Sequence, residues 1–255
     1  VRRVAPIGGV ITGQSIITKY LGQTTTTPGT CPGAATIPTP ASFSDFLFLR
    51  DGRMVAFSGL ELYWITRDGQ WQNQQIFTTA CNGRNLALGP SDDIYVACPR
   101  QVFRVAPGGE IDTTTGNPFI VAGDPSLPTN APSGDGGPAV DASLHNLAHR
   151  DMWVTPDGIL YFADGTDDRR LIRKVDGGII STVSGSVQGA NVTSGDRGPL
   201  AAATYRTIID AKLAADGNLY LLDHRVVRKV RLRHGGDDHV VPSEDGGALY
   251  VFDDT

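Results

Sequence analysis

The sequence has no apolar run that approaches the ~20 residues a membrane-spanning helix needs. It also lacks any long run of Lys or Arg, and its formal net charge is -5, which argues against a nucleic-acid binder. It contains no G-x-S-x-G nucleophile motif, P-loop or dinucleotide-binding fingerprint. No signal peptide is visible, and the chain begins at Val1 rather than Met, as expected for a chain processed or cut from a longer one.

Glycine and proline, by contrast, are abundant, with 31 and 16 residues in a chain of 255. That composition is typical of many short strands joined by tight turns, and an all-β chain of this length can form one domain. A two-part cassette recurs along the sequence. Its first half is an apolar run, a turn rich in Asp or Gly, and a second apolar run, which together predict a β-hairpin. Copies of this half begin at Phe46, Leu86, Met152, Ala211 and Val240.

The second half of the cassette is an amphipathic run that ends in another Gly-containing turn. Its copies begin at Val1, Leu62, Val102, Leu171 and Val226. The chain therefore starts with a second half and ends with a first half. A closed ring would let the hairpin at Val240–Asp254 pair with the strands that begin at Val1 and Val10, as β-propellers do.

The sequence thus predicts an all-β fold, a β-propeller closed by pairing of its N- and C-terminal strands. Five blades are visible, and a sixth would need sequence outside this chain. The blade around Leu219 is expected to lack its outer strand, because only about six residues separate it from the next run. We expect a single domain over residues 1–255, with blades at about 240–255 plus 1–20, 43–79, 83–122, 148–184 and 207–235.

The loops between the cassettes carry a family resemblance. The stretch "VAGDPSLPTNAPSGDGGPAVDASLHNL" resembles the linker of NHL-repeat propellers, and "VSGSVQGANVTSGDRGPLAAATYRT" is a second copy. A looser third copy is "LGQTTTTPGTCPGAATIPTPASFSDF". The end, "VPSEDGGALYVFDDT", resembles the junction that follows the NHL propeller in teneurin-like, YD (Rhs)-repeat proteins. This resemblance implies one module of a very large secreted or cell-surface protein.

Asp164 and Asp223 occupy the same place in two blades, the end of the second strand. They are candidates for the mouth of a central channel, where their carboxylates could bind a cation. The plainer interpretation, which we favour, is a turn carboxylate bonded to nearby backbone N–H groups. His224 follows Asp223 and is the histidine to test first for chemistry, although a hydrogen-bonded loop histidine is the more ordinary role.

Other polar residues give weaker signals. Asp135 and Asp196 lie in "SGDGGPA" and "SGDRGPL", where capping of a tight loop is favoured over calcium binding because each motif has one Asp. His145 and His149 would need a third ligand to hold zinc. Asn191 begins an N-x-T glycosylation sequon on an expected surface loop. The basic stretch from Arg228 to Arg233 is expected to form a solvated face.

Three cysteines do not form a metal-binding motif by their spacing. Cys81 and Cys98 lie at one end of the same expected hairpin, so a disulfide between them is geometrically reasonable. Pairing of Cys31 with Cys81, or three free thiols, are the alternatives. Either disulfide would imply an oxidising compartment.

The sequence therefore favours a non-enzymatic scaffold or binding module that is extracellular or at the cell surface. Its partner would be a protein or the flanking domains of the same polypeptide, with no nucleic acid, no membrane span and no cofactor beyond a weakly indicated calcium ion. No catalytic residue is assigned. One alternative is a propeller enzyme, similar to metal-dependent lactonases or lyases, with its site in the central channel. A free-standing secreted binding protein is a third hypothesis.

Overall fold

A computed structural model describes most of the chain between Phe43 and Arg231 and a short hairpin near each end. The described residues are 2–5, 16–19, 43–66, 70–77, 81, 83, 85–107, 109, 118–128, 132–145, 147, 152–165, 170–186, 192–214, 218–231, 239–242 and 249–252. The chain divides into two compact units. The first comprises Val1–Cys98 and Phe103–Phe119, and the second Pro99–Val102 and Ile120–Thr255.

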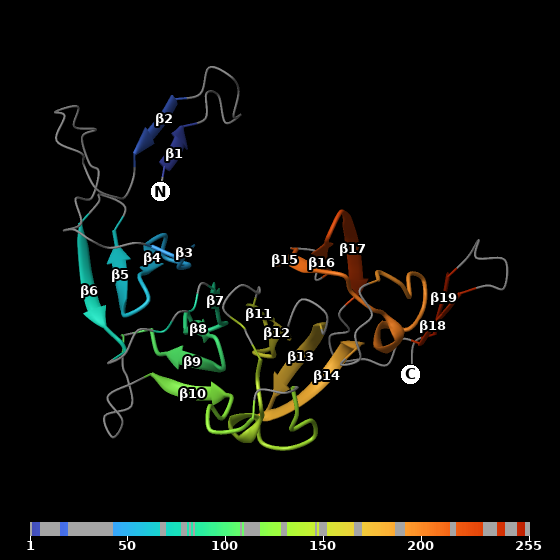
Figure 1. Ribbon diagram of the computed structural model, residues 1–255. Coiled ribbons are helices and arrows are strands. Elements are labelled where there is room, and N and C mark those ends of the chain that lie inside the picture. Colours follow the sequence, from blue (N-terminus) through green and yellow to red (C-terminus); the bar gives the residue numbers. More distant parts are fainter. Residues whose placement is uncertain are drawn as a thin grey trace. The chain divides into compact units, whose positions relative to one another are not determined.

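The described residues confirm the prediction of an all-β fold (Figure 1). Their strands form three four-stranded sheets, one three-stranded sheet and two two-stranded sheets. The ladders between consecutive strands are antiparallel, so each larger sheet is a meander. Single turns of 3-10 helix occur at η1 (Ala139–Asp141) and η3 (Leu200–Ala202).

Two four-stranded sheets come from the first half of the chain. One has the order β3-β4-β5-β6, and its strands are β3 (Asp45–Phe48), β4 (Met54–Phe57), β5 (Glu61–Ile65) and β6 (Trp71–Gln75). The other has the order β10-β9-β8-β7, and its strands are β7 (Asn85–Leu88), β8 (Ile94–Cys98), β9 (Gln101–Val105) and β10 (Phe119–Ala122). The predicted hairpins that begin at Phe46 and Leu86 are confirmed as β3–β4 and β7–β8.

The second half contributes a four-stranded and a three-stranded sheet. The first has the order β11-β12-β13-β14, with strands β11 (Met152–Val154), β12 (Leu160–Asp164), β13 (Arg170–Asp176) and β14 (Ile179–Ser186). The second has the order β15-β16-β17, with strands β15 (Ile208–Leu213), β16 (Asn218–Asp223) and β17 (Val226–Arg231). Within the described residues no fourth strand joins β17. Residues 232–238 lie outside the described part of the chain, so the missing outer strand stays a prediction.

Apolar residues on the central strands form the core of each unit. In the first unit, Phe77 makes edge-to-face contacts with Phe57 and Phe103, with ring centroids 6.1 and 5.0 Å apart. In the second unit, Trp153 stacks on Tyr161 with centroids 5.6 Å apart. Every residue of β12 is buried, so both faces of that strand are covered, as its near-continuous apolar sequence predicts.

Short hairpins occur near both ends of the chain. β1 (Arg2–Ala5) pairs with β2 (Ile16–Lys19), and β18 (His239–Pro242) pairs with β19 (Leu249–Phe252). The second pair confirms the hairpin predicted at Val240. The two hairpins form separate sheets, so ring closure by pairing of the terminal strands is not confirmed. The number of blades and the single domain over residues 1–255 stay predictions.

Candidate functional site

A buried ionic cluster connects the sheet β11–β14 to the linker that precedes it. Asp164 is the last residue of β12, Arg173 lies in the middle of β13, and Asp135 belongs to the linker motif "SGDGGPA". Arg173 Nη1 lies 3.2 Å from Asp164 Oδ2, and Arg173 Nη2 lies 2.7 Å from Asp135 Oδ1. The side chains of Arg173 and Asp164 are only 1% and 0% exposed. We call this cluster of Asp135, Asp164 and Arg173 the first ionic tie.

Backbone groups also bond to the side chains of the first ionic tie, although Arg173 Nε is buried without a hydrogen-bond partner. Arg173 donates to the carbonyl oxygens of Ser133 and Ser143, at 3.0 and 3.3 Å. The backbone N–H of His145 donates to Asp164 Oδ1 at 2.7 Å. Both oxygens of Asp164 therefore accept hydrogen bonds from within the fold, one from the linker and one from the neighbouring strand.

The two carboxylates of this tie differ in pKa because they differ in burial. Burial raises the pKa of Asp164 to about 6, although the N–H of His145 and the guanidinium of Arg173 oppose the rise. Burial acts in the same direction on Asp135, but hydrogen bonds from Thr182 and Arg173 outweigh it, so the pKa of Asp135 is lowered. The side chain of Asp135 is 48% exposed, which keeps its desolvation moderate.

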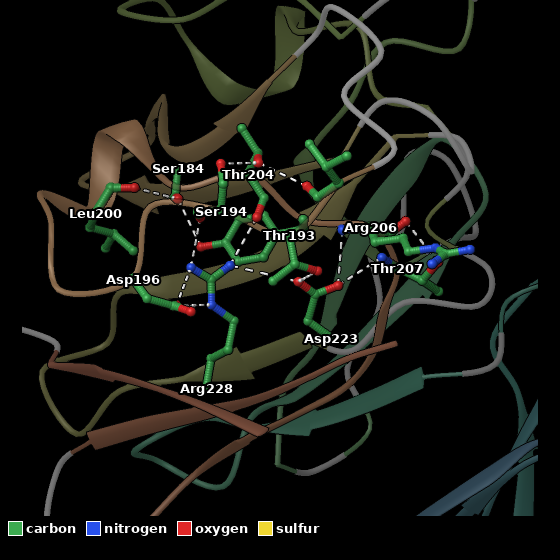
Figure 2. Close-up of polar contacts among 12 residues, drawn as sticks. Ser184, Thr193, Ser194, Asp196, Leu200, Thr204, Arg206, Thr207, Asp223 and Arg228 are labelled. Carbon is green, nitrogen blue, oxygen red and sulfur yellow. Dashed lines mark hydrogen bonds and ion pairs between the residues drawn. The ribbon is translucent and has the colours of Figure 1, made fainter. Parts of the chain in front are cut away.

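A second ionic tie repeats this arrangement in the sheet β15–β17 (Figure 2). It consists of Asp223 at the end of β16, Arg228 in β17, and Asp196 in the linker motif "SGDRGPL". Arg228 Nη2 lies 2.7 Å from Asp196 Oδ1, whereas Arg228 Nη1 lies 3.6 Å from Asp223 Oδ2. The Arg228 guanidinium also lies over the Tyr205 ring, 5.1 Å from its centroid. The Asp196 side chain is 70% exposed, so this tie is closer to solvent.

The carboxylate of Asp223, like that of Asp164, accepts hydrogen bonds from the linker. Its Oδ1 accepts from the backbone N–H groups of Arg206 and Thr207 at 2.9 and 2.8 Å (Figure 2). Its Oδ2 accepts from the hydroxyl of Thr193 at 2.9 Å. Thr193 is the third residue of the glycosylation sequon, whose Asn191 lies outside the described residues. The favoured interpretation of Asp164 and Asp223, as carboxylates bonded to nearby backbone N–H groups, agrees with these contacts.

The match between the two ties extends to their backbone acceptors. Arg228 donates to the carbonyl oxygens of Ser194 and Thr204 at 2.9 and 2.8 Å. Thr204 follows Ser194 by the same number of residues as Ser143 follows Ser133. Sequence reasoning missed the two arginines, and the prediction of a solvated basic face is wrong for Arg228, whose side chain is 9% exposed. One pattern in the sequence could have identified both arginines. In each of the two cassettes, a linker Asp, an Asp at the end of the second strand and an Arg in the next strand occur together.

The linker glycines allow this close packing. Gly134 and Gly195 have positive φ angles of 96° and 84°. A Cβ atom at Gly134 would lie 2.9 Å from the Cα of Ala142, and one at Gly195 would lie 2.7 Å from the Cα of Ala203. The Gly and Ala positions of the linker motif are therefore explained by one backbone segment crossing another without room for a larger side chain.

The equivalent position in the sheet β7–β10 carries a covalent link instead. Cys98 ends β8 as Asp164 ends β12, and Phe103 stands in β9 where Arg173 stands in β13. Cys98 forms a disulfide with Cys81, and their Cα atoms are 5.3 Å apart. Cys81 lies in the short linker before β7, and its N–H donates to the Gly59 carbonyl oxygen at 2.9 Å. Cys31, the alternative partner, lies outside the described residues.

In the sheet β3–β6 these positions hold the uncharged residues Ser58 and Tyr63. Tyr63 donates its hydroxyl to Glu61 Oε2 at 2.5 Å, and Asn73 donates to Glu61 Oε1 at 3.1 Å. Burial, assisted by the Glu61 carboxylate, raises the pKa of Tyr63 to about 12. Tyr63 therefore stays protonated at neutral pH and acts as a hydrogen-bond donor.

The predicted site histidine, His224, lies in the tight turn between β16 and β17. Its φ is 53°, and its backbone N–H donates to the Thr207 carbonyl oxygen at 2.8 Å. It is adjacent to Asp223, but the contacts of Asp223 described above come from the linker and from Arg228 in β17. His149 lies outside the described residues, so a zinc pair with His145 stays untested. Within the described residues, no group of three or more His, Cys, Asp and Glu side chains is arranged to hold a metal ion.

The described part of the chain contains no helix with the length and apolar character required to cross a membrane. No protein-family model and no curated protein matches the sequence. Solved structures of low similarity include virginiamycin B lyase from Staphylococcus aureus, at 12% identity and a TM-score of 0.46. Others are a streptogramin B lyase, at 11% and 0.42, and an extracellular domain from B. thetaiotaomicron, at 10% and 0.46.

The alignments cover 78%, 76% and 79% of this chain respectively. They cover 59%, 70% and 22% of the three solved chains, so this chain spans less than two thirds of the first and third. At these identities and TM-scores the similarities carry no argument about activity.

Proposed function

We propose that this chain is a non-enzymatic binding scaffold, built as an NHL-type β-propeller with five blades within a teneurin-like, YD-repeat protein. The linker motifs "SGDGGPA" and "SGDRGPL" and the terminal "VPSEDGGALYVFDDT" support the family assignment. The observation that carries the proposal is the engagement of both recurring strand-end carboxylates within the fold. Asp164 and Asp223 each accept hydrogen bonds at both oxygens, from the linker and from the neighbouring arginine or threonine.

A carboxylate that ligates a metal or transfers a proton must present an oxygen to the bound group. Asp164 and Asp223 direct their oxygens at protein donors, and their side chains are both 0% exposed. Their role in this proposal is to hold linkers against sheets. The surfaces left for recognition are then the exposed strand edges and loops, which is where a scaffold contacts its partners.

The Cys81–Cys98 disulfide supports the cellular location in the proposal. Disulfides persist in secreted and cell-surface proteins and are rare in the cytosol. A secreted or surface-exposed position is also where the NHL propeller of a teneurin-like protein operates. The proposed partner is another protein or a flanking domain of the same polypeptide.

Metal analysis of the purified chain, before and after treatment with a chelator, tests the non-enzymatic role. We expect no stoichiometric zinc or calcium and an unchanged melting temperature after chelation. One equivalent of metal that stabilises the chain, and that is lost in Asp223→Asn, would overturn the proposal. That result would favour the lactonase-like or lyase-like enzyme with a site in the central channel. The coding sequence after Thr255 tests the family assignment, because YD repeats there support it and a stop codon removes it.

A further inference from the structure

In both ionic ties, each aspartate is followed by a residue with a positive φ angle. In the first tie these following residues are glycines, Gly136 at 81° and Gly165 at 125°. In the second tie they carry basic side chains, Arg197 at 65° and His224 at 53°. Both ties thus need left-handed backbone at these positions, and only the first tie meets that need with the residue suited to it.

The backbone strain at Arg197 and His224 indicates a role for their side chains. Histidine is one of the residues enriched in the left-handed region, so Arg197 is the clearer exception. The first linker holds Gly136 at the place of Arg197, and a Cβ atom at Gly136 would lie in open space. A side chain at this place therefore extends away from the fold. Strained residues concentrate at functional sites, which makes these two candidates for recognition of another molecule.

Arg228 brings the two strained residues to one region of the sheet β15–β17. Its guanidinium contacts Asp196, which precedes Arg197, and Asp223, which precedes His224 (Figure 2). All of these residues belong to the second compact unit. Because a single guanidinium reaches both carboxylates, the two strained residues border one region of the surface.

Further basic residues lie at the same place. Arg225 is exposed and forms the tight turn between β16 and β17 together with His224. Arg206 donates its backbone N–H to Asp223 at 2.9 Å (Figure 2). We call the set of Arg197, Arg206, His224 and Arg225 the basic surface. With the arginine of the tie, four arginines lie near the two aspartates of the tie, so this region is locally positive although the net charge of the chain is -5.

Exposed valines flank the basic surface. Val192 is 57% exposed and directly precedes Thr193, whose hydroxyl donates to Asp223 at 2.9 Å. Val226 is 45% exposed and directly follows Arg225. Arginine beside exposed apolar side chains is typical of surfaces that bind polypeptides. A sulfated polysaccharide, by contrast, has no apolar side chain to bury against the valines.

We propose that the basic surface binds an acidic segment of a partner polypeptide, with carboxylates on the arginines and an apolar side chain against the valines. Arginine suits this role because its planar guanidinium can donate two parallel hydrogen bonds to one carboxylate. The strain at Arg197 is accepted because it presents a charged side chain from the linker turn. This inference rests on the proposed scaffold function and names the class of partner and the place where it binds.

Short labelled peptides provide the probe. The first consists of Glu and Ser around a central Val, the second replaces each Glu with Gln, and the third replaces each Glu with Lys. Fluorescence polarisation with the intact chain should show saturable binding of the Glu peptide, at least about tenfold tighter than that of the Gln peptide. The Lys peptide should not bind, because its charges repel those of the basic surface. Added salt should weaken the Glu peptide, because it screens exposed charges.

Variants of the chain locate the binding at the basic surface. Arg197→Gly with Arg225→Gln should weaken the Glu peptide at least about tenfold, because two guanidinium groups are lost. Arg50→Gln with Arg104→Gln is the matched control, because it removes two exposed arginines from the first unit and should leave binding unchanged. Arg197→Glu with Arg225→Glu should reverse the preference and select the Lys peptide. Circular dichroism melting curves establish that each variant is folded.

Three results would overturn the inference. They are the absence of saturable binding by the Glu peptide, an equal loss of binding in the double variant and in its control, and a heparin fragment that binds more tightly than the Glu peptide and is lost in the double variant. The last would identify a sulfated polysaccharide as the ligand. None of these results touches the metal analysis, so a failure at the basic surface with metal-free protein removes this site and leaves the scaffold function standing.

Discussion

The end of the second strand is anchored differently in two regions of the molecule. In the sheet β7–β10 of the first half, Cys98 is joined to the preceding linker by a disulfide with Cys81. In the sheet β11–β14 of the second half, Asp164 is joined to its linker by a hydrogen bond from His145 and by the buried Arg173. One structural task, holding a linker against a sheet, is carried out by a covalent bond in one region and by ionic groups in the other.

In this chain the residues at two positions differ together between the sheets. Where the strand ends in Asp164 or Asp223, the next strand holds Arg173 or Arg228 two residues beyond the position that faces the aspartate. Where it ends in Cys98, the corresponding position holds an aromatic residue. A buried carboxylate needs a positive partner to offset its desolvation, whereas a disulfide is apolar and packs well against a ring.

The largest effect is expected from Arg173→Met. This change leaves Asp164 buried without its positive partner, and breaking a buried pair in this way costs about 3–5 kcal/mol of unfolding free energy. Urea unfolding followed by circular dichroism measures the loss. The double variant Arg173→Met with Asp164→Leu should lose less, because no buried charge remains. A loss of unfolding free energy below about 1 kcal/mol in the single variant would contradict the role of the first ionic tie as an anchor comparable to the disulfide. The tie would then contribute as little as a surface ion pair.

Removing the disulfide should have the next largest effect. The bond closes a loop between residues 17 positions apart, and Cys81→Ser with Cys98→Ser should cost about 3 kcal/mol through the entropy of the unfolded chain. Urea unfolding of the oxidised chain and of the double variant measures the difference. Cys31→Ser is the control and should leave stability and the peptide disulfide map unchanged. A mapped Cys31–Cys81 bond would contradict the pairing.

Arg228→Met should destabilise the chain less than Arg173→Met does. The Asp196 side chain is 70% exposed, and Asp223 keeps hydrogen bonds from Thr193 and two backbone N–H groups after the change. We expect a loss of about 1–3 kcal/mol in the same urea assay. A loss equal to or greater than that of Arg173→Met would show that burial is not what separates the two ionic ties.

The pH dependence of stability should separate Asp164 from ordinary carboxylates. Because its folded-state pKa is raised to about 6, the native chain binds this proton more tightly than the unfolded chain between about pH 4 and 6. The wild type should therefore lose stability, relative to Asp164→Asn, as pH rises through this window, by about 1–2 kcal/mol. Urea midpoints at several pH values measure the difference.

The smallest expected effect compares the two linker motifs directly. Arg197 has a φ of 65° where Gly136, in the first copy, has a φ of 81°. An L-residue in this conformation is strained, so Arg197→Gly should raise the unfolding free energy by about 0.5 kcal/mol after the added entropy cost of glycine. The reverse control, Gly136→Ala, should lower stability by a similar amount. A loss of stability in Arg197→Gly would indicate that the arginine side chain contributes more than its backbone strain costs.

Much of the local structure was predictable from the sequence. Apolar runs around Asp-Gly or Asp-Asp turns predicted the hairpins β3–β4, β7–β8 and β18–β19, because these signals act over a few residues. The spacing of the cassettes placed Asp164 and Asp223 at equivalent strand ends, and the structure keeps them there.

The partners of these carboxylates were not predictable in the same way. The alternation in β17 assigns Arg228 to a face of the strand but does not say whether a linker returns to cover that face. Asp196 lies more than 30 residues before Arg228, and no local pattern connects the two. Closure of the ring likewise depends on segments at opposite ends of the chain, and hairpin signals at each end do not specify their pairing.

By itself, the sequence determined the strand and turn pattern and the recurrence of the linker motif, because β-pleating and positive φ angles depend on neighbouring residues. Only the tertiary structure decided which charges are buried and which are solvated. A carboxylate such as Asp164 is a surface group or a desolvated anchor according to what packs over it, and that cover comes from a linker distant in the sequence.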